Sequence, residues 1–87
     1  MRITFTKKFD KQLRKSPDNI KKSFHKKLAL FIEDRYHPLL LNHRLAGKLH
    51  PYRSINITGD WRAIFRETSD GNGVYFVSFG THSQLYQ

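Results

Sequence analysis

The sequence predicts an α+β fold with a short N-terminal strand, a two-helix antiparallel hairpin and a three-stranded antiparallel meander. Apolar residues recur every three to four positions up to about residue 32, which is the period of a helix with one buried face. From about residue 52 they alternate with polar residues, and glycine-containing turns separate the alternating runs. A chain of 87 residues supports one small core. We therefore expect one domain, residues 1–87, with both helices on one side of a mainly antiparallel sheet.

The first strand and the first helix are predicted from residues 2–15. Residues 2–5 (Arg-Ile-Thr-Phe) alternate between polar and apolar side chains, as a short half-buried strand does. Phe5, Phe9 and Leu13 then recur every four positions, so we expect a helix from about Thr6 to Lys15.

The second helix is predicted to begin directly after a short turn, so that the two helices form an antiparallel hairpin. Ser16 suits the N-cap, Pro17 the first helical position and Asp18 the positive end of the helix dipole. We expect the helix to end near Tyr36, because Pro38 disfavours helix at the residue before it. Its apolar stripe consists of Ile20, Phe24, Leu28, Phe31 and Ile32.

The second half of the chain is predicted to form the meander. Residues 37–51 have neither a helical nor a strand period, and we expect an extended connection whose leucines anchor it to the core. Gly59-Asp60 and residues 70–73 (Asp-Gly-Asn-Gly) are typical of tight hairpin turns. The three strands are Tyr52 to Thr58, Trp61 to Glu67 and Val74 to Phe79.

The charge of the chain restricts its partners. A net charge of +9 on 87 residues favours a polyanionic partner, such as nucleic acid, an acidic protein or a membrane surface. The sequence has no apolar run of roughly 18 residues and no leader typical of a signal peptide, so we expect a cytoplasmic protein without a membrane partner. The absence of cysteine excludes disulfides and thiolate metal sites.

Basic residues are concentrated before residue 28, where only Asp10 and Asp18 oppose them. On the two predicted helices they fall largely opposite the apolar stripe and form a solvated basic face. Such a face can serve solubility alone. The size of the imbalance favours contacts with phosphate groups and a steep salt dependence of binding. The candidate phosphate contacts on the helices are Lys7, Lys8, Lys11, Lys22 and Lys26.

The histidines do not have the spacing of a metal site. His37, His43 and His50 are six and seven positions apart within the predicted connection, without a motif such as His-Glu-x-x-His. We expect no metal and no other cofactor.

Histidine together with arginine suits the cleavage of RNA by its own 2′-hydroxyl. That reaction needs a base, an acid for the leaving oxygen and cations for the charged phosphorane. Histidine can be either proton-transfer group, and arginine binds phosphate through two parallel hydrogen bonds. A tyrosine such as Tyr86 can stack on an unpaired base. The predicted polar side of the sheet supplies Arg53, Asn56, Asp60, Arg62 and Arg66. A surface ion pair of Arg66 with Glu67 or Asp60 is the alternative explanation for that arginine.

Four segments in a fixed order resemble the RelE/ParE toxin superfamily, most closely the YafQ-like branch of the RelE/StbE messenger-RNA interferases. The resemblance covers nearly the whole chain, and the Asp-Trp and Gly-Thr-His-Ser segments are its more specific parts. The segments are Asn42-His43-Arg44-Leu45-x-Gly47, Tyr52-Arg53, Gly59-Asp60-Trp61-Arg62-x-Ile64-Phe65 and Gly80-Thr81-His82-Ser83-x-Leu85-Tyr86.

The resemblance implies a RelE-like microbial ribonuclease-type fold and a toxin that is neutralised by a cognate antitoxin, here one with an acidic segment. It implies cleavage of messenger RNA on the ribosome without a metal. His82 matches the catalytic histidine near the C-terminus, here taken as the general acid. His43 and Asp60 match a histidine and an acidic residue of the family pattern. Tyr86 stands where RelE-like members have a tyrosine that orients the substrate, and Arg62 resembles their transition-state arginine.

One position departs from the YafQ-like pattern, because Asn56 stands where that pattern has a histidine four residues before the aspartate of Asp-Trp. An amide cannot act as a general base near neutral pH. Either His43 or Asp60 takes that role, or Arg62 compensates, or the activity is weak. Two other functions stay open, a ParE-like inhibitor of DNA gyrase without nuclease activity and a non-catalytic basic RNA-binding domain.

Each site residue also has an ordinary structural explanation. His82 can cap the end of the last strand, His43 can be a loop residue bonded to the main chain, and Asp60 can be a turn residue. We expect Trp61 to belong to the core rather than to the site.

Overall fold

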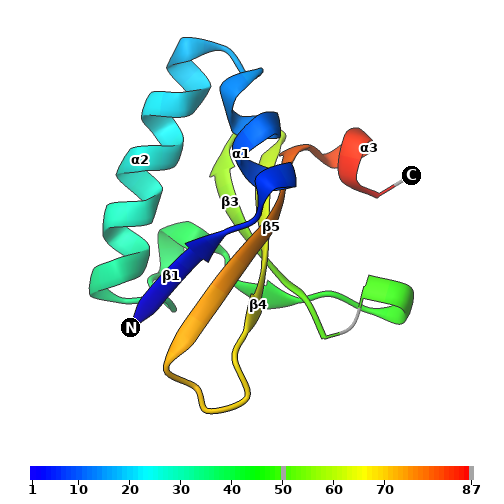
Figure 1. Ribbon diagram of the computed structural model, residues 1–87. Helices are drawn as coiled ribbons and strands as arrows, with labels where there is room; N and C mark the ends of the chain where they lie inside the picture. The colour runs from blue at the N-terminus through cyan, green and yellow to red at the C-terminus, as the bar shows by residue number, and fades with distance from the viewer. Residues whose placement is uncertain (50, 87) are drawn as a thin grey trace.

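Five strands form one mixed sheet in the order β1-β5-β4-β3-β2 in the computed structural model, which describes residues 1–49 and 51–86 (Figure 1). β1 pairs with β5 in parallel, and the other neighbours are antiparallel. The predicted strand, helical hairpin and meander are confirmed, with the helices on one side of the sheet. The elements are β1 (Arg2–Phe5), α1 (Lys7–Arg14), α2 (Asp18–Glu33), β2 (His43–Arg44), β3 (Arg53–Thr58), β4 (Trp61–Glu67), β5 (Gly73–Thr81) and α3 (His82–Leu85).

Phenylalanine dominates the core between the helices and the sheet. Phe76 is fully buried at its centre, and its ring lies 5.5 Å from Phe9 on α1 and 5.5 Å from Phe31 on α2, between ring centroids. Six of the seven phenylalanines are buried, and Phe5 packs against them. Edge-to-face and tilted ring pairs of this kind add to the free energy gained by burial.

The turn between the helices differs from the prediction. Thr6 caps α1, since its hydroxyl accepts a hydrogen bond from the amide of Phe9. Ser16 does not cap α2, because it is buried and its hydroxyl donates to the carbonyl oxygen of Leu13 at the end of α1. Pro17 is therefore the N-cap of α2, and it supplies no side-chain hydrogen bond.

α2 ends three residues earlier than predicted. Asp34 is extended, and its carboxylate accepts a hydrogen bond from the amide of Tyr36, which leads the chain out of the helix. Ile32 was predicted on the apolar stripe but is 57% exposed. It follows the buried Phe31 by one position, about 100° round the helix, so both cannot face the core.

Residues 37–49 are more ordered than the predicted extended connection. Two short 3₁₀ helices, Pro38–Leu40 and Gly47–Leu49, flank β2, which adds a fifth strand at the edge of the sheet. Leu40 and Leu45 are buried, as anchoring requires, but Leu39 and Leu41 are exposed. His50 lies outside the described residues.

The end of the chain folds back as α3, which was not predicted. Thr81 caps this helix: its hydroxyl accepts from the amide of Gln84, and the Gln84 side chain accepts from the amide of Thr81. A Cβ atom at Gly80 would lie 2.8 Å from Oε1 of Gln84, so glycine lets β5 pass close beneath the helix.

The face of the sheet opposite α1 and α2, called the open face below, carries the alternate residues of the same strands. Because Ile55, Ile57, Ala63 and Phe65 point into the core, their neighbours along β3 and β4 point to the open face. Ile64 and Leu45 are buried outside the main core. None of the described helices has the length and apolar character needed to cross a membrane.

Candidate active site

Arg62 is the most firmly held basic side chain of the open face. It lies opposite Asn56 in the β3–β4 register. Its Nη1 atom donates to Oδ1 of Asn56 (2.8 Å) and to the main-chain oxygens of Gly59 (2.8 Å) and Trp61 (3.0 Å). Gly59 has a φ of +50°, which a glycine adopts without strain and which turns its carbonyl oxygen toward the guanidinium. One nitrogen thus makes all three bonds, and within residues 1–49 and 51–86 Nε and Nη2 make no side-chain hydrogen bond.

His82, the first residue of α3, lies directly beside the turn whose carbonyl oxygen binds Arg62. The main-chain amide of His82 donates to the main-chain oxygen of Asp60 at 2.9 Å, and both side chains are exposed. The rings of His82 and of Tyr86, the C-cap of α3, lie 4.6 Å apart between centroids. The main chain of α3 thus begins next to the Gly59–Asp60 turn, to which Arg62 also bonds.

His43 approaches the same face from the edge strand. It pairs with Ser54 in the β2–β3 register, so its side chain shares the open face with Ser54 and lies diagonal to Asn56. Its Nδ1 atom lies 2.8 Å from the carbonyl oxygen of Leu41. A carbonyl oxygen only accepts, so in the neutral imidazole Nδ1 carries the proton and the free lone pair is on Nε2.

Arg53 does not belong to this group, contrary to the prediction. It has the same parity as Ile55 and therefore points to the helix-covered side of the sheet. There its Nε atom donates to Oδ1 of Asn42 at 2.8 Å, and its guanidinium lies 5.7 Å from the centre of the Tyr36 ring.

Arg66 lies on the open face opposite Tyr75 and is exposed. Glu67 pairs instead with Arg35, between Oε2 and Nη1 at 2.6 Å. Within residues 1–49 and 51–86, neither Arg62 nor Arg66 has a carboxylate within 4.0 Å. Both guanidinium charges are thus available to an anion.

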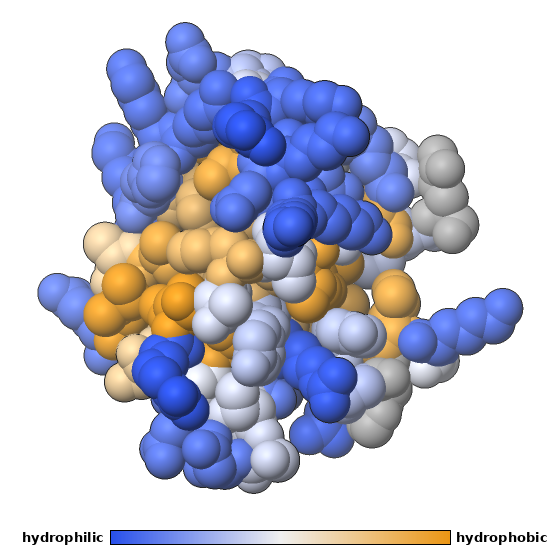
Figure 2. All heavy atoms as spheres, in the orientation of Figure 1, coloured by the Kyte–Doolittle hydropathy of each residue, from blue (hydrophilic) through white to orange (hydrophobic). Residues whose placement is uncertain are grey.

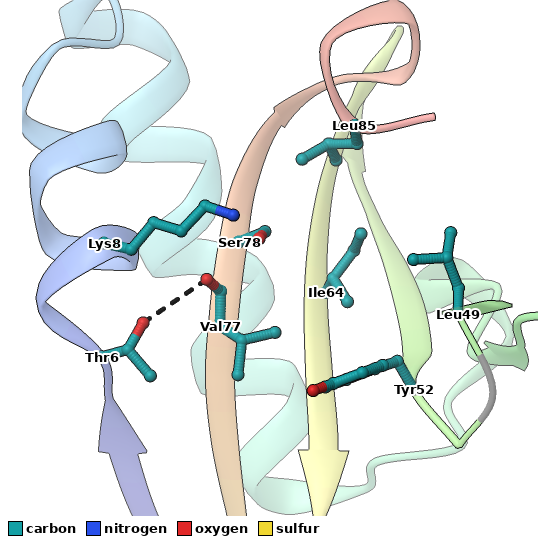
Figure 3. Close-up of a pocket in the computed structure, with 8 residues that line it drawn as sticks. All are labelled: Thr6, Lys8, Leu49, Tyr52, Ile64, Val77, Ser78 and Leu85. Carbon is teal, nitrogen blue, oxygen red and sulfur yellow. Dashed lines mark hydrogen bonds between the residues drawn. The ribbon is translucent and has the colours of Figure 1, made fainter. Parts of the chain in front are cut away.

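The candidate lysines divide between the two sides of the sheet. Lys8, near the start of α1, extends over β5 toward Ser78 on the open face (Figure 3). Lys22 and Lys26 are exposed on α2, on the covered side. In Figure 2 hydrophilic side chains gather at the top of the molecule, where Figure 1 draws α1 and the start of α2. Lys7 and Lys11 are exposed on α1.

Trp61 packs against the core, as predicted, with its ring 5.6 Å from that of Phe79 between centroids. In the part of the chain that the structure describes, no three His, Asp or Glu side chains come together as a metal site would require. Away from the site, in the turn before β5, a hydrogen bond from the Thr68 hydroxyl lowers the pKa of Asp70.

A hollow of about 450 Å³ adjoins the Arg62 end of the open face (Figure 3). Ile64 lies in its floor, two residues beyond Arg62 on the same face of β4. Tyr52 and Leu49 border it on the β3 side and Leu85 on the α3 side. No sequence pattern indicated this hollow, because the segment before β3 was expected to be extended.

The family model described as bacterial toxin of type II toxin–antitoxin system, YafQ, matches residues 1–87. The chain belongs to this toxin family. The predicted RelE/YafQ-like resemblance is thereby confirmed. A search of curated proteins returned no match.

Solved structures of YafQ and related toxins have the same fold as this chain. YafQ from Escherichia coli strain BL21(DE3) matches with a TM-score of 0.82 at 20% identity, covering 100% of both chains. A metal-bound toxin from Helicobacter pylori matches with a TM-score of 0.76 at 27% identity, over 99% of both chains. The E. coli DinJ–YafQ complex matches with a TM-score of 0.69 at 23% identity, over 100% of both chains.

Proposed function

We propose that this toxin is an endoribonuclease that cuts messenger RNA on the ribosome, without a metal, by attack of the RNA 2′-hydroxyl on the neighbouring phosphorus. The observation that carries the proposal is the position of Arg62 between two histidines. The strand order puts Arg62 on β4, with His43 on β2 to one side and His82 after β5 to the other. Three strand spacings are roughly 14 Å across the sheet, and His43 is also displaced from Arg62 by two residues, roughly 7 Å along the strand. In the proposed complex both imidazoles therefore reach inward to one phosphate group bound by Arg62.

Arg62 binds the scissile phosphate in this mechanism. Its Nη1 atom is held by Asn56, Gly59 and Trp61, while Nε and Nη2 can donate to two phosphate oxygens. Donors fixed before the reaction stabilise the charge that develops on the phosphorane. Asn56 is thus a positioning residue, although it occupies the place of a family histidine.

The two histidines divide the proton transfers. Nε2 of His43 removes the 2′-hydroxyl proton, because the Leu41 carbonyl oxygen keeps the proton on Nδ1. The 2′-oxygen bonds to phosphorus, the bond to the 5′-oxygen breaks, and His82 protonates that oxygen. The products are a 2′,3′-cyclic phosphate and a 5′-hydroxyl. Tyr86, beside His82, stacks on an unpaired nucleobase. Asp60 is the alternative to His43 as the general base.

The decisive experiment is cleavage of messenger RNA on programmed ribosomes in the presence of EDTA. We expect the wild type to cut under these conditions and His82→Ala to lose at least about 100-fold in rate. His25→Ala is the matched control, since His25 is an exposed histidine on α2. Comparing His43→Ala with Asp60→Asn identifies the base. Cleavage that requires a metal would contradict the mechanism, and so would full activity of His82→Ala.

Intact messenger RNA in that assay would favour the ParE-like alternative, which inhibition of DNA gyrase supercoiling tests. If the wild type and both histidine variants bind RNA but none of them cuts it, the result would instead favour a non-catalytic basic domain. A gyrase inhibitor has no evident need for an imidazole beside a phosphate-binding arginine.

The partner that neutralises the toxin is a cognate antitoxin with an acidic segment that folds on binding. Membership of a toxin–antitoxin family, the net charge of +9 and the solved DinJ–YafQ complex support this partner. Expression of this chain alone should stop growth, and co-expression of its cognate antitoxin should restore it. Harmless expression of the folded chain would contradict the proposal.

A further inference from the structure

The open face continues from Arg62 into a trough that a tyrosine divides in two. The hollow with Ile64 in its floor measures about 450 Å³, and a second one of about 480 Å³ lies beyond it. Thr6, Tyr52 and Val77 border both hollows. In Figure 3 the Tyr52 ring is seen nearly edge-on over β4, with its hydroxyl toward β5. The ring is therefore the partition between the hollows, and each of its faces looks into one of them.

Tyr52 is held at this place by its main chain. Its amide donates to the carbonyl oxygen of Leu49 at 2.7 Å, and its carbonyl oxygen accepts from the amide of Leu45 at 2.9 Å. Leu45 is itself buried. The ring thus stands on an anchored segment, while its side chain is only partly buried.

Each hollow combines an apolar surface with one cation, and the farther one is also lined by Glu67, whose carboxylate is paired with Arg35. The hollow nearer the catalytic residues has Ile64 in its floor and Lys8 at its rim. The farther hollow contains Arg66, which has no ion pair within the described residues. Arg62, Ile64 and Arg66 follow one another on the open face of β4, roughly 7 Å apart. This alternation of cation, apolar floor and cation suits a strand that carries one phosphate and one base per step.

We propose that Tyr52 inserts between two successive unpaired bases of the RNA, one in each hollow, and so holds the strand that leads away from the cleaved bond. This inference rests on the proposed nuclease function. Aromatic rings stack on any base, so the site grips single-stranded RNA without demanding a sequence. Bases on the two faces of one ring lie roughly 7 Å apart, twice the stacked spacing of about 3.4 Å per nucleotide, which an extended single strand reaches.

RNA suits the trough better than an antitoxin segment does, because the floor is continuous with Arg62 and both faces of the ring are open. A peptide side chain needs only one hollow. Two hollows on either side of one aromatic ring match the repeat of a nucleic acid, whose planar bases follow one another at a fixed spacing.

Binding of a short single-stranded RNA to the His82→Ala variant tests the inference without cleavage. 2-Aminopurine is placed at one position after another along the RNA, and its fluorescence is quenched where it stacks. We expect quenching at two adjacent positions. Tyr52→Ala should weaken binding about 10- to 100-fold and abolish the quenching at both positions, whereas Tyr52→Phe should bind within about twofold of its parent.

Tyr52→Leu and Tyr36→Ala complete the design. A leucine side chain keeps apolar bulk without a π-system, so Tyr52→Leu should fold normally and still bind weakly, which separates stacking from folding. Tyr36 is an exposed tyrosine on the covered side, and Tyr36→Ala should leave RNA binding unchanged. Quenching at a single position, or unchanged binding by Tyr52→Ala, would overturn the inference.

Two further outcomes separate this inference from the proposed function. Wild-type cleavage together with unchanged RNA binding by Tyr52→Ala leaves the nuclease intact and removes the stacking site. Weaker binding of the antitoxin but not of RNA would assign the trough to the antitoxin instead. A wild type that never cuts messenger RNA contradicts the nuclease itself, whatever Tyr52 does.

Discussion

The two faces of the sheet are built from alternate residues of the same strands, yet they carry different kinds of side chain. The covered face holds phenylalanines that pack against α1 and α2, and Phe76 contacts rings from both helices. The open face holds Asn56, Arg62 and Arg66, with a smaller apolar area around Ile64. One face therefore supplies most of the stability, and the other is left free to bind a substrate.

The largest expected effect compares neighbouring residues of β5. Phe76→Ala should lower the free energy of unfolding by about 3–5 kcal/mol, because it leaves a cavity among the core rings. Val77→Ala, in the trough, should lower it by about 1 kcal/mol or less. Denaturation in guanidinium chloride measures both. If both variants lost the same free energy of unfolding, the open face would be a second hydrophobic core, and the two faces would not differ in their contribution to stability.

Two arginines on opposite faces of the sheet provide the next comparison. Arg62→Ala should reduce the rate of messenger-RNA cleavage by about 100-fold or more, the usual loss for a prealigned donor. Arg53→Ala should leave the rate nearly unchanged and lower stability by about 1–2 kcal/mol, since it loses its bond to Asn42. Single-turnover cleavage and chemical denaturation measure the two effects. A catalytic defect in Arg53→Ala would return Arg53 to the active site, where the sequence analysis placed it together with Arg62.

The comparison of Arg53 with Arg62 shows how far the sequence alone leads. β4 was predicted to the residue, because Trp61 to Glu67 alternates cleanly between turn signals. Arg53 was assigned to the wrong face although it shares the parity of Ile55, so alternation itself could have corrected it. The two residues of β2 carry no period, and only pairing with β3 makes them a strand. α3 did leave a signal, the Thr81-x-x-Gln84 capping box.

The site was less predictable than the fold. Asp60, Arg62 and His82 were identified from motifs, and their role in a site stays a prediction. In the structure the main-chain amide of His82 bonds to Asp60, and Arg62 bonds to Gly59 in the same turn. The bond of Arg62 to Asn56 depends on the β3–β4 register, and the Tyr52 partition depends on the fold of the segment before β3. Neither arrangement is a local property of the sequence, so no motif could have shown it.

α3 provides a smaller and more local test of the open face. Thr81→Ala should remove the cap of this helix, at a cost of about 1 kcal/mol, and fray the turn that carries His82 and Tyr86. We expect faster hydrogen exchange at the Gln84 amide and cleavage slowed about tenfold, while the core keeps its stability. Thr81→Ser keeps the hydroxyl and is the matched control. Unaltered cleavage with a frayed helix would show that the open face needs no ordered C-terminus.

The smallest expected effect separates lysines of the open face from lysines of the helices. Lys8→Gln removes one cation from the rim of the trough, so it should weaken binding of single-stranded RNA a few-fold and reduce the salt slope by roughly 0.7. The double variant Lys22→Gln, Lys26→Gln removes two charges from α2, on the covered side, and should leave that slope unchanged. Anisotropy titrations at several salt concentrations measure both slopes.

If the double variant lowered the slope by more than Lys8→Gln, short RNA would bind the basic helices, and the open face would lose its special role. If the double variant instead weakened only the action on ribosomes, the helices would contact a larger polyanion while the open face holds the strand that is cut.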